Sequence, residues 1–150
     1  AEAGASDFDA DYFSVTAGMG VRGITIALGY EVLGSDDGNY GFSTPLATLH
    51  LFNGWSDQFL STPVNGLKDM SVTLKGGLAG GKWTVVYHDY SADQASPGVD
   101  DLGDEWGVAY NRSFAENYSA GVKYAMYSAG DTSAGKVDTN KLWLTLGASF

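Results

Sequence analysis

The sequence predicts an all-β protein in which antiparallel strands follow one another up and down a single sheet. Apolar and polar residues alternate with period two along about seven stretches, and no long stretch carries an apolar stripe at helical spacing. Short turns also alternate with longer connections that are rich in Gly, Asp, Ser and Pro. Since 150 residues normally support one domain, we expect 1–150 to form a single β region.

Each expected strand has one apolar and one polar face. In the first strand, for example, Phe13 and Val15 alternate with Ser14 and Thr16. The expected strands cover about 11–21, 23–34, 69–78, 83–90, 105–111, 118–127 and the tail from about 138. Tight turns are expected near 21–23, 79–82 and 114–117, and longer connections over 35–68, 93–103 and 129–138. An additional strand within 40–60 is the alternative organisation.

The composition narrows the class of protein. The net charge of -10 argues against a nucleic-acid partner, because phosphate binding needs clustered lysine and arginine. The absence of cysteine excludes disulfides and thiolate metal sites. Charged residues make up 17% of the chain, below the roughly 25% usual for soluble domains, so a fully water-exposed exterior is unexpected.

The polar face distinguishes two kinds of β-barrel. A soluble barrel turns its apolar face inward and its charged face to water. Here the polar face consists mostly of Gly, Ser, Thr and Ala, which suits the inside of a barrel, and the apolar face is long enough to cross a bilayer. Aromatic residues also fall near the expected strand ends, as in interfacial girdles: Phe13, Trp106, Trp83, Phe114, Tyr118 and Phe150. We therefore expect a transmembrane β-barrel.

Two segments carry a family resemblance. The tail "KLWLTLGASF" resembles the last strand of Gram-negative outer-membrane proteins, and "FSTPLATLHLFNGWSDQFLSTPVNGLKD" (42–69) resembles porins grouped with alginate-export proteins. The first resemblance implies recognition of Phe150 by the barrel-assembly machinery. The second implies a wide barrel in the bacterial outer membrane, in contact with lipid and lipopolysaccharide, that passes a solute or an anionic polysaccharide.

Strand parity bears on the completeness of the barrel. Outer-membrane barrels place short turns and the C-terminus in the periplasm, and bacterial single-chain barrels have an even number of strands. Seven strands counted back from Phe150 leave the start of the chain on the extracellular side. We therefore expect residues 1–150 to be the C-terminal part of a longer porin-like chain, with 35–68 as a long extracellular loop. The oligomeric state stays open.

Two groups of residues are candidate solute contacts. If the loop 35–68 folds into the lumen, its polar and aromatic residues would narrow the pore; otherwise it packs against the rim or a neighbouring subunit. The loop candidates are His50, Asn53, Trp55 and Asp57. Charges on the polar face would line the pore and set its ion preference. These are Glu31, Asp69, Lys75, His88, Glu105, Lys123 and Lys141. The lysines either form a ladder for anions or pair with Glu31 and Glu105.

We expect no catalytic activity, cofactor or metal. His88 and Asp89 are neighbours in a strand and so point to opposite faces, and no serine nucleophile elbow, HExxH or phosphate-binding loop occurs. "DFDAD" opens like a calcium loop but lacks the later glycine and glutamate. The expected function is a channel for small hydrophilic solutes or ions. The alternative is a non-conducting β-barrel, lipocalin-like or membrane-anchored, that binds a ligand or surface partner.

Overall fold

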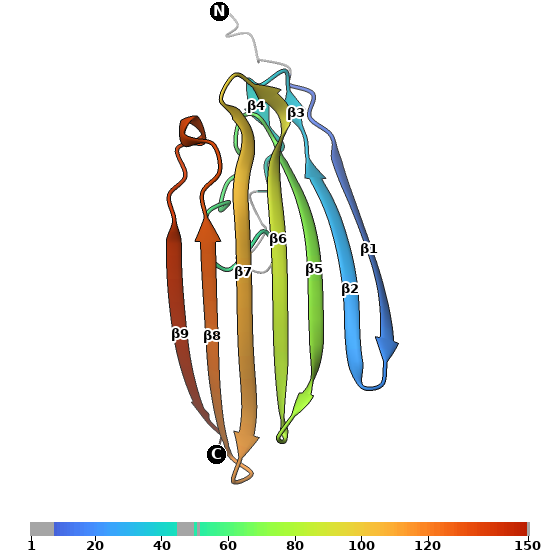
Figure 1. Cartoon of the computed structure of the whole chain (residues 1–150), viewed down its shortest axis with the longest axis vertical. Helices are drawn as coiled ribbons and strands as arrows, with labels where there is room; N and C mark the ends of the chain where they lie inside the picture. The colour runs from blue at the N-terminus through green and yellow to red at the C-terminus, as the bar shows by residue number, and fades with distance from the viewer. Residues whose placement is uncertain (1–7, 45–49, 51, 150) are drawn as a thin grey trace, which may run out of the picture.

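The computed structural model describes residues 8–44, 50 and 52–149, and they form one large antiparallel sheet. Its seven strands lie side by side in chain order (Figure 1). They are β1 (Tyr12–Val21), β2 (Ile24–Leu33), β5 (Leu67–Leu78), β6 (Gly81–Ser96), β7 (Val99–Phe114), β8 (Tyr118–Ser128) and β9 (Thr139–Ala148). The expected all-β, up-and-down antiparallel order is confirmed.

The sheet is open. In the described part of the chain β1 and β9 form the two edges and do not pair with each other, so no closed barrel is present there. The smaller elements are a hairpin of β3 (Ser35–Asp36) and β4 (Tyr40–Gly41), and a 3₁₀ turn, η2 (Thr132–Ala134). The described residues contain no helix of the length and apolarity needed to cross a bilayer. Within 40–60 they add only β4 to the strands, and β4 lies outside the large sheet.

Tight turns join the strands at one end, drawn at the bottom of Figure 1. In the β1–β2 turn, Arg22 and Gly23 have φ of 51° and 83°, and in the β5–β6 turn Ala79 and Gly80 have φ of 50° and 75°. Two consecutive residues with positive φ are typical of the type I′ turn, whose twist matches that of a hairpin. The expected positions of these turns are confirmed.

The prediction of a long connection over 93–103 is wrong. β6 continues to Ser96 and β7 begins at Val99, so only Pro97 and Gly98 connect them. The pairing register shifts between Tyr90 and Ser91 and again before Ser96. Because these irregularities break the period-two pattern, the extension does not read as strand in the sequence. Its presence also leaves Trp106 near the middle of β7, not at a strand end.

Polarity is distributed in the opposite way to that of a water-soluble sheet. One face, which we call the apolar face, is open: Leu142, Leu144 and Leu146 in β9 are 61%, 75% and 84% exposed. On the other face, Glu105 and Asp69 are 0% and 4% exposed. This second face is the covered face, because the connection between β4 and β5 lies across it (behind β5 to β8 in Figure 1).

A small apolar core lies where this connection meets the loop-bearing end of the sheet. Phe59 of the connection packs against Tyr90 and Tyr127, with ring centroids 4.5 Å and 6.1 Å away. The remaining buried members of this cluster are Leu33, Leu67, Ala92 and Leu102. The connection is therefore held by packing at this end and, further along the sheet, by polar contacts.

Replacing Leu102 by alanine should destabilise the protein far more than replacing Leu144. Leu102 is 1% exposed, so its loss leaves a cavity and should lower the free energy of unfolding by about 2–5 kcal/mol. Leu144 contacts little protein, and its replacement should cost less than about half as much. Urea unfolding in detergent micelles measures both, and equal losses would contradict the assignment of the two faces.

Candidate functional site on the covered face

The connection between β4 and β5 is fastened to the sheet by a buried carboxylate. We call its described residues, 50 and 52–66, the crossing segment. Glu105 in β7 accepts hydrogen bonds from the backbone N–H of Trp55 (2.5 Å) and of Ser56 (3.0 Å), and from the Ser56 hydroxyl. Three donors therefore compensate a carboxylate that water does not reach.

Gly54 makes this approach possible. Its φ of 90° is disfavoured for residues with a side chain. A Cβ atom at this position would lie 2.6 Å from Oε2 of Glu105 and collide with the Tyr90 hydroxyl. The segment thus presents its N–H groups to Glu105 only because residue 54 has no side chain.

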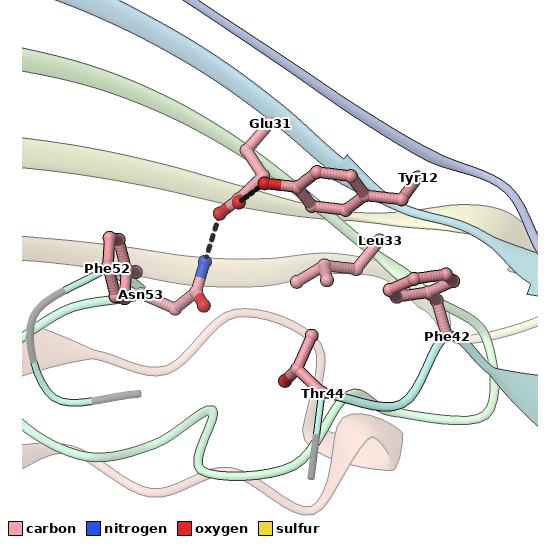
Figure 2. A pocket seen from close by; sticks show the side chains of 7 residues that line it. All are labelled: Tyr12, Glu31, Leu33, Phe42, Thr44, Phe52 and Asn53. Atoms are coloured by element: carbon pink, nitrogen blue, oxygen red, sulfur yellow. Dashed lines mark hydrogen bonds between the residues drawn. The ribbon is translucent and has the colours of Figure 1, made fainter. Parts of the chain in front are cut away.

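Asn53 connects the crossing segment to two further carboxylates. Its side-chain amide donates to Oε2 of Glu31 in β2 (2.8 Å) and, more weakly, to Oδ2 of Asp69 in β5 (3.4 Å). The Tyr12 hydroxyl donates to the other Glu31 oxygen at 2.7 Å (Figure 2). Asp69 in turn lies 2.8 Å from Nδ1 of His88.

A chain of charged groups connects the segment to β8 and β9. Asp57 accepts from Nζ of Lys141 (2.8 Å) and contacts Nδ1 of His50 (2.5 Å), while Nε2 of His50 lies 2.5 Å from Nζ of Lys123. Since an ammonium group can only donate, the contact with Lys123 requires Nε2 of His50 to accept, which leaves Nδ1 to donate to Asp57. The Lys123 ammonium also lies over the ring of Trp143, 4.6 Å from its centroid.

These contacts shift the pKa of Asp57. Partial burial acts to raise the pKa, but the hydrogen bonds from Lys141 and His50 outweigh it and leave the pKa below its ordinary value. Asp57 therefore stays ionised, and its contacts persist, into the mildly acidic range.

Ten of the eleven residues singled out in the sequence take part in these contacts. The exception is Lys75, which makes no hydrogen bond or ion pair with another described residue. Lys123 and Lys141 contact the crossing segment and are not paired with Glu31 or Glu105. The crossing segment lies against the covered face, whereas its place in a lumen and the lining of a pore stay predictions. Phe150 lies outside the described residues.

Sequence reasoning missed several members of the site. Asp69 and His88 are both among the candidate residues, but the sequence does not predict their contact across β5 and β6. Ser56 and Tyr12 carry no motif, and their roles come from strand register and from the path of the crossing segment. Tyr90, 1% exposed, stacks on His88 with ring centroids 5.5 Å apart, and its hydroxyl has no hydrogen-bond partner among the described residues. Only the turn signal "NGWS" at 53–56 indicates that the backbone of the crossing segment could approach the sheet closely.

Four cavities follow one another along β1, β2, β5 and β6 beside the crossing segment, and we call them the cavity row. Neighbouring cavities share lining residues: Glu31 and Phe52, then Ser71 and Phe52, then Lys75 and Thr84. Their volumes are about 380, 110, 400 and 430 Å³. The row begins near the carboxylate of Glu31 and ends near Lys75 and Lys82.

The covered face supplies mainly polar contacts. Among the described residues, no group of three His, Cys, Asp or Glu side chains is arranged to hold a metal ion. Comparison of the chain with protein families, with curated proteins and with solved structures gives no match. The geometry of the covered face is therefore the basis for any assignment of function.

Replacing Glu105 by glutamine should loosen the crossing segment. Glutamine retains one acceptor oxygen but loses the charge, so the hydrogen bonds to Trp55 and Ser56 should weaken by about 1–3 kcal/mol. Hydrogen exchange of the 52–58 backbone amides should accelerate accordingly. Glu116→Gln, in the exposed β7–β8 turn, is the matched control. Equal exchange in the two variants would exclude Glu105 as the anchor.

The contribution of Asp57 to stability should depend on pH. A carboxyl whose folded-state pKa is depressed contributes stability that is present above the unfolded pKa, about 3.9, and is lost as pH falls through the folded value. The difference in unfolding free energy between the wild type and Asp57→Asn should therefore be constant above about pH 5 and shrink below about pH 4. A difference that stays unchanged down to pH 2 would contradict this assignment.

Proposed function

We propose that this chain forms part of the wall of an outer-membrane β-barrel, and that the barrel is a channel for small hydrophilic solutes or ions. The observation that carries the proposal is the inverted polarity of the sheet. Glu105, Asp69 and His88 are buried on the covered face, while leucines up to 84% exposed occupy the other face. Such an apolar surface is unfavourable in water and favourable against lipid.

The strand lengths fit a bilayer. β1, β2 and β9 have 10 residues each, and transmembrane strands need about 9–11 residues at a tilt of about 45°. The apolar face continues across neighbouring strands, from Val15 and Leu28 to Val72, Val108, Val122 and Leu144. An apolar band of this kind surrounds transmembrane barrels.

In a bilayer the backbone groups at the two sheet edges must also be hydrogen-bonded. Unpaired N–H and C=O groups are costly in hydrocarbon, so the free edges of β1 and β9 must pair with further strands. With seven antiparallel strands, β1 and β9 run in the same direction. Antiparallel closure therefore requires an odd number of additional strands between them, from the same chain or from another.

A conducting barrel is favoured over a filled one by the cavity row. The crossing segment lies over only part of the covered face, and the cavities beside it are lined by hydroxyls, glycine and single charges, including Thr16, Gly29, Ser71 and Lys75. A polar path beside an inward-folded segment is the arrangement that narrows a pore and sets its selectivity. The resemblance of 42–69 to porins supports the same reading. In this proposal Phe150 serves barrel assembly, and lipopolysaccharide contacts the wall.

The complete barrel should conduct in planar bilayers, and Lys75→Glu should shift its ion preference toward cations. Lys75 has no described partner, so permeating ions experience its charge with little compensation. Reversal of this charge should change the anion-to-cation permeability ratio by about fivefold or more, since unit charges about 4 Å apart in water interact by about 1 kcal/mol. Reversal potentials in a salt gradient measure the ratio.

Arg112→Glu provides the matched control for this experiment. Arg112 carries the same charge near the tight turns, at the exposed end of β7, and does not line the cavity row. Its reversal should leave the permeability ratio almost unchanged. Absence of single-channel currents in verified insertions would overturn the channel proposal, and equal effects of the two variants would exclude the cavity row as the permeation path.

A further inference from the structure

We propose that the first cavity of the row, between β1, β2 and the crossing segment, binds small organic ammonium ions. Figure 2 shows this cavity, with Glu31 between Tyr12 and Asn53 and with Leu33 beside Phe42. It combines one carboxylate with three aromatic rings in a volume of about 380 Å³, within the range of small-molecule sites. The inference adds a ligand class that channel function alone does not specify.

The Glu31 carboxylate faces the cavity without a cationic partner among the described residues. Its two oxygens accept hydrogen bonds from the Tyr12 hydroxyl and from the Asn53 amide, which are both neutral donors. No described lysine, arginine or histidine forms an ion pair with Glu31, whereas Asp57 is paired with Lys141 and Asp69 with His88. A carboxylate offers about four lone-pair directions, so Glu31 has acceptor capacity left for a cation.

The aromatic rings suit the rest of such a cation. Tyr12 and Phe42 are stacked, with ring centroids 5.4 Å apart, and Phe52, 58% exposed, approaches from the crossing segment. Ring faces attract ammonium groups, and the effect is largest where the cation leaves water. The methyl or methylene groups of an alkylammonium ion would contact these rings and Leu33. Glu31 and nearby Asp69 would repel an anion of the same size.

Comparing the binding of choline with that of its neutral isostere 3,3-dimethylbutan-1-ol distinguishes an ammonium site from an apolar pocket. Isothermal titration calorimetry of the full chain in detergent micelles should show choline binding at least about fivefold tighter than the alcohol, because only choline is attracted by Glu31 and by the ring faces. Glu31→Gln should weaken choline binding by about fivefold or more and leave binding of the alcohol unchanged. Glu116→Gln, the same change in the distant β7–β8 turn, should affect neither.

Phe42→Leu tests the aromatic part independently and keeps the site testable if Glu31→Gln does not fold. Leucine preserves apolar packing but removes a ring face, so choline binding should weaken about twofold to fivefold while the alcohol binds as before. Circular dichroism verifies the fold of each variant. The proposal is overturned if choline does not bind, if both probes bind equally, or if Glu31→Gln acts no more strongly than Glu116→Gln.

Failure of this inference is distinguishable from failure of the channel proposal. Conductance is measured on the same preparations without choline. A barrel that conducts but shows no preference for choline overturns only the ammonium site. Binding of choline with the expected dependence on Glu31, in a protein that carries no current, supports the site and overturns the channel.

Discussion

The arrangement of the covered face depends on the buried carboxylate of Glu105. Isolated burial of a charge would be prohibitive, and the N–H groups of Trp55 and Ser56 with the Ser56 hydroxyl offset that cost. Because these donors belong to consecutive residues of one turn, the interaction fixes both position and orientation of the crossing segment. Asn53 and Asp57, on either side of that turn, are thereby brought to Glu31 and to Lys141. One anchored turn thus organises contacts with five strands.

The apolar core of the described residues is small and lies at one end of the sheet. Side-chain packing is concentrated around Phe59, Tyr90 and Tyr127 at the loop-bearing end, while the sheet toward the tight turns is held mainly by backbone hydrogen bonds. In water those bonds would compete with solvent across an exposed apolar face. In the proposed bilayer setting the lipid removes that competition and makes an unpaired backbone group more costly. The environment, and not a second layer of protein, would then supply the missing stabilisation.

The sequence predicts well what depends on local periodicity. Alternation places Glu31, Asp69, Glu105 and Lys141 on one face, and turn composition locates the tight connections. Contacts that depend on register or on irregular backbone are not readable in this way. The β5–β6 turn sets a register in which His88 pairs with Ser71 and lies diagonally across from Asp69. The extension of β6 does not show the period-two pattern because its register shifts. The path of the crossing segment is likewise decided by Gly54 and Glu105, 51 positions apart in the numbering of the chain.

The cavity row has unlike charges near its two ends. Glu31 on β2 pairs with Asp69 on β5, and Lys75 follows Asp69 by six positions. Glu31 and Lys75 are therefore separated by roughly 20 Å along the strands. At this separation, beyond the Debye length of about 8 Å at physiological ionic strength, each charge acts on a permeating ion almost independently. Lys141 and Asp57 compensate each other, and Lys123 leaves one positive charge on β8, whereas the cavity row follows β1, β2, β5 and β6. In the proposed channel, a cation would therefore be favoured at Glu31 and opposed at Lys75, and an anion the reverse. Ion selectivity would then follow from the balance of Glu31 against Lys75 and Lys82, which line the same cavity, and not from a continuous ladder of lysines.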